Sequence, residues 1–177
     1  MGTMPGKRRA AAGHGRRLSH SVIAALVGIA TVQGLAMVID KPVVAVSALE
    51  ALAESAAGTL VPLRGHEHRI VHRAGRGTVW TETRDSGERI LCVAGGVEHI
   101  DRRVHDFLKR EARHDLSKAA HHYAEALGVK VKRISIRDQS SRWGSCSTTG
   151  VLSYSWRLIL APPHVLDYLA AHEVAHL

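Results

Sequence analysis

The sequence predicts an α+β domain, and three features support this prediction. Short runs rich in β-branched residues alternate with glycines between positions 66 and 94. The stretch after them repeats apolar residues every three or four positions, as a helix with one buried face does. A last helical segment ends on two histidines four residues apart. We therefore expect an antiparallel sheet, one long helix and a C-terminal helix that carries the functional groups.

The first part of the chain differs from the rest in charge. The formal net charge of the 177 residues is +8, and residues 1–20 contribute +5 because they hold five basic residues and no acid. We expect these 20 residues to form a basic disordered tail. The remainder is nearly neutral, so its composition does not indicate a surface for nucleic acid. Two cysteines are too few for a disulfide-rich scaffold.

An apolar segment follows at residues 21–58. Its first part, residues 21–39, contains no charged residue and as a helix would approach the thickness of a bilayer core. It can be interpreted as a membrane anchor, as the core of a signal peptide or, because many of its residues are β-branched, as buried strands. We set this segment apart from the domain that we expect over residues 59–177.

Three strands and a long helix are predicted next. The runs HRIVHR, TVWTET and ERILCVAG are separated by glycines and predict an antiparallel meander. We interpret His66, His68 and His72 in the first run as surface residues. A helix is predicted from Glu98 to Leu127, ended by Gly128. Its apolar face comprises Ile100, Val104, Phe107, Leu108, Ala112, Leu116, Ala119, Tyr123 and Leu127.

Two further strands and a final helix complete the predicted domain. Residues 131–137 (VKRISIR) and 151–157 (VLSYSWR) alternate as strands do, and a loop of residues 138–150 connects them. Pro162-Pro163 can start a helix, which we expect to run to the end of the chain. Its apolar residues Val165 and Leu169 are continued at helical spacing by His172 and His176.

The final helix contains the pattern His172-Glu173-Val174-Ala175-His176, or HExxH. Residues four apart lie on one face of a helix, so two imidazoles can bind one metal ion. The glutamate between them can accept a proton from a water on that metal. The alternative is a pair of histidines satisfied by hydrogen bonds within a core.

The stretch RISIRDQSSRWGSCSTTGVLSYSWRLILAPPHVLDYLAAHEVAHL resembles the YgjP-like family of bacterial zinc metallopeptidases, which is related to the SprT-like proteases. The resemblance depends on RWGSC, the segment from WRL to AP, and HExxH, in this order. It is strongest over Arg133–Leu177 and extends back to Pro62. It implies a zincin-like fold, Zn²⁺ as cofactor, a peptide or protein substrate and a cytoplasmic location.

The resemblance also implies roles for individual residues. His172 and His176 would bind zinc, and Glu173 would be the catalytic base. The residues expected to line the substrate cleft or to support it are Arg142, Trp143, Gly144, Ser145, Cys146 and Trp156. Cys146 could suggest a thiol nucleophile or a ligand, but in this pattern we interpret it as structural.

The chain departs from the family pattern at both ends. Family members continue beyond HExxH to a downstream histidine, in a segment resembling NHSxxFW, which supplies the third zinc ligand. This sequence stops one residue after His176, so we expect a C-terminally truncated chain that binds zinc weakly and cleaves no peptide. Residues 1–58 do not resemble the start of the family, as expected for an anchor, a misread N-terminus or a reading-frame error.

Two other classes of function stay open beside the metallopeptidase. One is a non-catalytic binding module, DNA-associated as some SprT-like relatives are, which only the basic tail and the mixed charges of the long helix support. The other is a protein anchored in the inner membrane through residues 21–39.

Overall fold

The computed structural model describes residues 58–138 and 142–177. The elements in chain order are β1 (Leu60–Leu63), β2 (His66–Arg73), β3 (Val79–Thr83), β4 (Arg89–Ala94), η2 (Val97–His99), α3 (Ile100–Leu127), β5 (Arg133–Arg137), β6 (Gly144–Cys146), β7 (Val151–Ser155), η3 (Trp156–Leu160) and α4 (Pro163–Val174). The two η elements are short 3₁₀ helices. The predicted α+β class is confirmed.

The predictions for the basic tail and for the apolar segment lie outside the described residues, apart from Gly58. No helix within residues 58–138 or 142–177 combines the length and the hydropathy that crossing a membrane requires.

The two sheets are mixed, so the prediction of an antiparallel sheet was wrong. The first sheet has the order β1-β2-β4-β3, in which β2 and β4 are parallel while both outer pairs are antiparallel. The second has the order β5-β7-β6, in which β5 and β7 are parallel. The predicted meander fails because β3 lies on the far side of β4 and does not pair with β2. Alternation of residues identifies a strand but not the neighbour with which it pairs.

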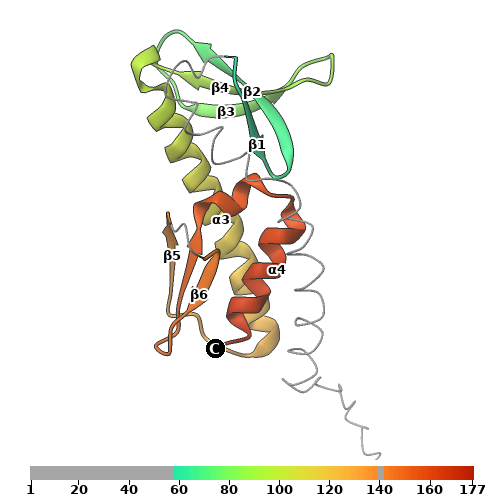
Figure 1. Cartoon of the computed structure of the whole chain (residues 1–177), viewed down its shortest axis with the longest axis vertical. Helices are drawn as coiled ribbons and strands as arrows, with labels where there is room; N and C mark the ends of the chain where they lie inside the picture. Colours follow the sequence, from blue (N-terminus) through green and yellow to red (C-terminus); the bar gives the residue numbers. More distant parts are fainter. Residues whose placement is uncertain (1–57, 139–141) are drawn as a thin grey trace, which may run out of the picture.

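Helix α3 runs along the long axis of the molecule and connects the two sheets (Figure 1). It starts two residues later than predicted because η2 forms the preceding turn. It ends at Gly128, whose φ of 69° is left-handed and whose N–H bonds the carbonyls of Ala124 and Glu125. Its buried residues are Ile100, Val104, Phe107, Leu108, Ala112, Leu116, Ala120 and Ala124. The predicted stripe is therefore buried as far as Leu116. Its last three residues, Ala119, Tyr123 and Leu127, are partly buried and pack against the core beside the buried Ala120 and Ala124.

One histidine of β2 lies in the interior, which corrects its interpretation as a surface residue. His68 is 7% exposed, and its Nδ1 lies 2.8 Å from the carbonyl oxygen of His66. His72 is half-buried, with Nε2 2.6 Å from the carbonyl oxygen of Gly95. Both imidazoles are satisfied by backbone oxygens rather than by a carboxylate, a possibility that the sequence does not reveal.

The tip of the β1–β2 hairpin fixes the place where α4 begins. The backbone N–H groups of Arg64 and Gly65 donate to the carbonyls of Ile159, at 2.7 Å, and Leu160, at 3.2 Å. A Cβ atom on Gly65 would lie 2.9 Å from Cα of Pro162, so only glycine fits against the start of the helix. On the other side, the Arg64 guanidinium contacts α3 through the carboxylates of Asp115, at 2.7 Å, and Glu111, at 3.0 Å.

Helix α4 contacts both α3 and β6. The hydroxyl of Tyr123 on α3 donates to the carboxylate of Asp167 at 2.6 Å. From the sheet side, the hydroxyl of the buried Tyr154 on β7 donates to the carbonyl of Ala170 at 3.5 Å. The helix ends at Val174 rather than at the end of the chain, and the next two residues form a turn.

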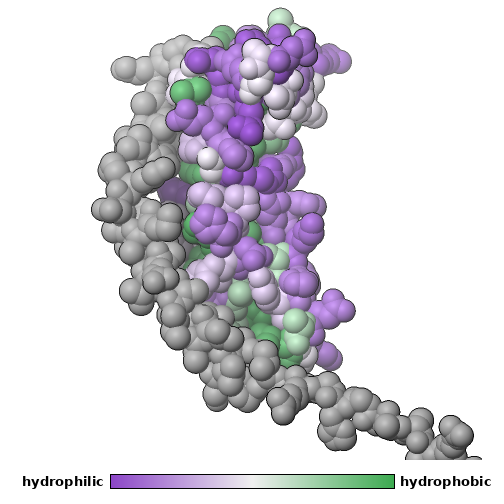
Figure 2. All heavy atoms as spheres, turned by 90° about the vertical axis from the view of Figure 1, so that its right-hand side faces the viewer, coloured by the Kyte–Doolittle hydropathy of each residue, from purple (hydrophilic) through white to green (hydrophobic). Residues whose placement is uncertain are grey.

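The surface differs along the length of the molecule. Hydrophilic side chains predominate at the upper end, where the four-stranded sheet lies, and hydrophobic ones gather toward the lower end (Figure 2).

Candidate metal centre

The two histidines of HExxH lie close together at the end of α4. Their Nε2 atoms are 3.3 Å apart, and their ring planes cross at 85°. His172 belongs to the last turn of the helix and is half-buried, whereas His176 lies in the following turn and is exposed. The histidines thus mark the point at which the apolar face of α4 opens to solvent, and they are not enclosed in a core.

Glu173 is buried although it is ionisable. Its residue is 7% exposed, and its carboxylate accepts a hydrogen bond from the backbone N–H of Cys146. Burial raises the pKa of this carboxyl above its ordinary value, while the nearby His172 and His176 and the Cys146 N–H oppose that shift. Burial therefore makes the protonated form of this carboxyl more favourable than it is in an exposed glutamate.

The side chain of Glu173 packs against Gly144. A Cβ atom at this position would lie 2.7 Å from Oε1 of Glu173 and 2.9 Å from its Cγ, closer than non-bonded atoms come. Gly144 is held there by β6, which pairs antiparallel with β7 so that Gly144 is opposite Tyr154. The glycine in RWGSC is thus explained by the approach of the glutamate in HExxH.

A cleft of about 420 Å³ adjoins these residues. Its lining consists of Gly144, Ser145, Cys146, Ser147, Thr148, Glu173 and His176. The structure therefore brings three of the six residues expected from RWGSC and the following strand to one cleft with the glutamate and one histidine. Ser147 and Thr148 were not singled out from the sequence, because small polar residues in a loop are common in any protein.

The other three expected residues do not line this cleft. Arg142 and Trp143 are exposed, at the start of β6. Trp156 belongs to η3, because the strand that we predicted over residues 151–157 ends at Ser155. Its indole is 2% exposed, with the ring of His105 edge-on at 5.0 Å and the Arg157 guanidinium at 5.1 Å. Trp156 thus packs in the core.

Cys146 resembles a structural residue more than a reactive one. Burial, and to a lesser extent the charge of Glu173, raises the pKa of its thiol. The thiol lies 3.5 Å from the carbonyl oxygen of Ser147, to which it can donate. A thiol kept in its protonated form is a poor nucleophile and a poor metal ligand.

A complete metal-binding group is not found in the part of the chain that the structure describes. Within residues 58–138 and 142–177, no group of three or more His, Cys, Asp or Glu side chains is placed so that it could hold a metal ion. The two histidines are therefore a pair of candidate ligands, and the described residues place no third ligand beside them.

The chain matches the family described as YgjP-like, metallopeptidase domain, over residues 30–177. This match covers most of the sequence, so the chain belongs to that family of metallopeptidase domains, as the resemblance indicated. The match begins inside the apolar segment that we set apart at residues 21–58. No curated protein and no solved structure matches the chain.

Proposed function

We propose that this chain is a zinc-dependent peptidase domain in which His172 and His176 bind the metal. The observation that supports this most directly is the 3.3 Å separation of their Nε2 atoms. Two nitrogen ligands of a tetrahedral zinc ion, each about 2.0–2.1 Å from the metal, lie roughly 3.3 Å from each other. The pair therefore has the spacing of two ligands that share one ion, although a third ligand from a histidine remains a prediction.

In this proposal the chain has a zincin-like arrangement, with the HExxH helix beside the edge strand of a sheet. Glu173 is a residue of α4, and its side chain packs against Gly144 of the edge strand β6. It lines the same cleft as His176. A substrate peptide would enter the cleft along Gly144–Cys146, where the backbone of the edge strand is open to it.

Zinc, when bound, would activate a water molecule and polarise a peptide carbonyl. Glu173 would take the proton of the attacking water and later deliver it to the leaving amine. Burial raises the pKa of the Glu173 carboxyl, which makes it a stronger base than an exposed glutamate. The Cys146 N–H would hold the carboxylate in one position while it does so.

Metal titration tests the ligand pair. We expect Co²⁺ or Zn²⁺ binding by the 177-residue chain to be lost in His172→Ala and in His176→Ala. Glu173→Gln should retain binding, because glutamate is not a ligand in this proposal. His164→Ala is the matched control, since His164 is an exposed histidine of the same helix. Metal binding that survives in both histidine variants would contradict the proposal.

Peptide cleavage tests the assigned role of Glu173. The assay uses zinc-loaded protein with and without added imidazole, which can occupy an open ligand position. We expect Glu173→Gln to abolish any cleavage that the wild type shows while its zinc content is unchanged. Cleavage at the wild-type rate by this variant would exclude Glu173 as the base and favour another reaction at the same site.

A further inference from the structure

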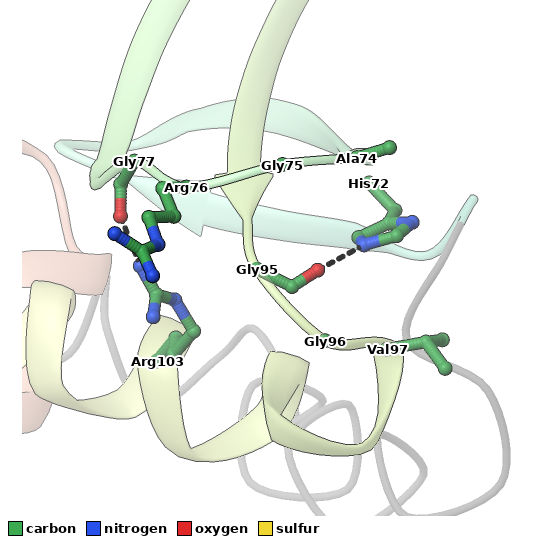
Figure 3. Close-up of a pocket in the computed structure, with 9 residues that line it drawn as sticks. All are labelled: His72, Ala74, Gly75, Arg76, Gly77, Gly95, Gly96, Val97 and Arg103. Atoms are coloured by element: carbon green, nitrogen blue, oxygen red, sulfur yellow. Dashed lines mark hydrogen bonds between the residues drawn. The ribbon is translucent and has the colours of Figure 1, made fainter.

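A second pocket, of about 640 Å³, lies at the start of α3 (Figure 3). The histidine pair is at the other end of the molecule, where α4 ends (Figure 1). The pocket is lined by the loop after β2, residues 74–77, and by the loop after β4, residues 95–97. Because β2 and β4 are parallel neighbours, both loops leave the same edge of the first sheet. In open sheets, ligands commonly bind beyond the carboxyl ends of parallel strands.

The charges that line this pocket are of one sign. Arg76 and Arg103 contribute guanidinium groups, and no acidic residue is among the lining residues. Figure 3 shows the two guanidinium groups turned toward each other from the loop and from the helix. Arg76 makes no side-chain hydrogen bond or ion pair with any residue in the described ranges, and Arg103 donates through Nη2 to the carbonyl of Gly77. An anion between them would relieve their mutual repulsion.

Two consecutive glycines, Gly95 and Gly96, form the loop beside Arg103. Gly95 has a φ of 110°, and a Cβ atom on it would lie 3.2 Å from Nη1 of Arg103, so the absent side chain lets the guanidinium lie against the loop. Gly96 and His99, the N-cap residues of η2 and α3, form no side-chain capping hydrogen bond. The three-residue η2 separates this loop from the start of α3, and neither cap residue provides a side-chain acceptor for the backbone N–H groups there.

One acid next to the pocket opposes anion binding. The carboxylate of Glu98 lies against Gly96, in the space that a Cβ atom there would fill. It is paired with Nε2 of His99 at 3.4 Å, and its side chain is 65% exposed. Since Glu98 stands beside the pocket but does not line it, its charge should weaken the attraction without occupying the space.

We propose that this pocket binds the phosphate group of a small molecule. Arg76 and Arg103 would supply the charged contacts, and the backbone N–H groups at Gly95 and Gly96, in the loop after β4, would supply neutral donors. Donors that converge from two loops and from a helix side chain suit a tetrahedral anion better than a planar carboxylate. The cavity is larger than one phosphate and lies in the range of sites for small ligands. The proposal is independent of the peptidase site.

The test is a titration of the ¹⁵N-labelled 177-residue chain with sodium phosphate at constant ionic strength, followed by NMR. We expect saturable shifts of the amides of Gly95 and Gly96, and a weaker response to sodium acetate. Arg76→Gln should raise the Kd for phosphate by about tenfold or more, as expected for loss of a charge-assisted contact. Glu98→Gln should lower it. Arg102→Gln, which removes an exposed charge one residue before Arg103, is the matched control and should leave it unchanged.

Several results would overturn the proposal. Amide shifts that do not saturate, or that occur near every exposed arginine, would indicate only general ionic attraction. A Kd that rises as much in Arg102→Gln as in Arg76→Gln would have the same meaning. Acetate binding as tight as phosphate binding would exclude phosphate as the ligand class. Because Arg76 has no side-chain partner among the described residues, its replacement should not affect folding, which thermal unfolding of the variant checks.

Discussion

At the scale of single residues, the contact between Gly144 and Glu173 connects the RWGSC segment with the HExxH segment. RWGSC and HExxH are almost thirty residues apart in sequence, and each is explained by the other in the fold. The glycine provides the space, and Cys146 provides the N–H that the carboxylate accepts. The packing of Glu173 on Gly144 is by itself a reason for a glycine at position 144, without any contact to a substrate.

Gly144→Ala tests this contact. The added methyl group would meet Oε1 and Cγ of Glu173, so we expect the free energy of unfolding to fall by about 1–3 kcal/mol, as overpacking does. Any peptidase activity should fall as well, because the carboxylate must move. Urea unfolding measures the first effect and peptide cleavage the second.

Ser145→Ala is the control for this experiment. It removes one atom from the neighbouring residue of the same strand and adds nothing near Glu173. A loss of stability in Ser145→Ala equal to that in Gly144→Ala would show that β6 tolerates no change at all, and would contradict the specific contact.

Residues of the site differ in how far the sequence reveals them. The histidine pair and Glu173 can be found because a helix places positions four apart on one face, and the spacing alone determines their proximity. The packing of Glu173 on Gly144 cannot be found in this way, because it depends on the side of α4 to which β6 comes. Trp156 illustrates the same limit. Strand β7 ends one residue before it, and if the strand continued through Trp156, the indole would point in another direction.

At the scale of elements, the position of α4 depends on contacts from both sides. The hydrogen bond between Tyr123 and Asp167 secures it to α3, and it raises the pKa of the tyrosine to about 12. The main cause of that shift is the hydrogen bond to the carboxylate, with burial adding to it. The hairpin tip at Gly65 limits where the helix can begin.

A double-mutant cycle measures the strength of the contact between α3 and α4. We expect Tyr123→Phe to lower the free energy of unfolding by about 0.5–1.5 kcal/mol, the usual net value of one hydrogen bond. When Asp167→Asn is already present, the same change should cost less, because the charged acceptor is gone. Equal costs in both backgrounds would show that the two side chains do not interact.

Strand β2 gives the protein a pH-dependent term through His68. Burial is the main cause that lowers the pKa of this imidazole below its ordinary value, against the opposing hydrogen bond to His66. The neutral form is therefore favoured in the folded state. Its contribution to stability is fully present above about pH 6.5, the ordinary pKa, and is lost as the pH falls through the lower folded value.

We therefore expect His68→Gln to reduce the loss of stability on acidification. The measurement is urea unfolding of wild type and variant at about pH 7.5 and 5.5, which bracket the ordinary pKa of histidine. The difference between the two pH values should be smaller in the variant. A decrease that is the same in both proteins would mean that folding does not lower the pKa of His68.

The type of each long element was predictable from the sequence, and the arrangement of the strands was not. The buried face of α3 follows from residues such as Val104, Leu108 and Leu116, which repeat along the chain. The partner of a strand is decided by connections and by the packing of distant segments, as the parallel pairing of β2 with β4 shows. Strand β6 was missed because Gly144, Ser145 and Cys146 have no β-branched side chain among them.

At the scale of the whole molecule, α3 makes one cooperative unit of two sheets that do not pair with each other. Its buried residues form a single hydrophobic cluster with residues of both sheets, from Ile70 on β2 to Leu152 on β7. We expect Leu116→Ala to cost about 2–5 kcal/mol, because the residue is fully buried in the middle of that cluster.

The loss in Leu116→Ala should appear equally in both halves of the molecule. Native-state hydrogen exchange measures this, since the most protected amides of β4 and β7 should lose the same opening free energy. Glu125→Ala, an exposed change on the same helix, is the control and should have little effect. Destabilisation confined to β7 would show that the two sheets unfold separately.

The hairpin tip has a consequence for the order in which the protein forms. Arg64 and Gly65 leave the ribosome well before Ile159 and Leu160, whose carbonyls accept their N–H groups about 95 residues later in the chain. The first sheet can therefore close its strands early, but its tip must stay bonded to water until η3 has been synthesised. Contacts of such long sequence separation slow folding. A nascent chain that is interrupted before η3 therefore has the strands of the first sheet, but it lacks the two hydrogen bonds at the hairpin tip and the residues of the candidate site.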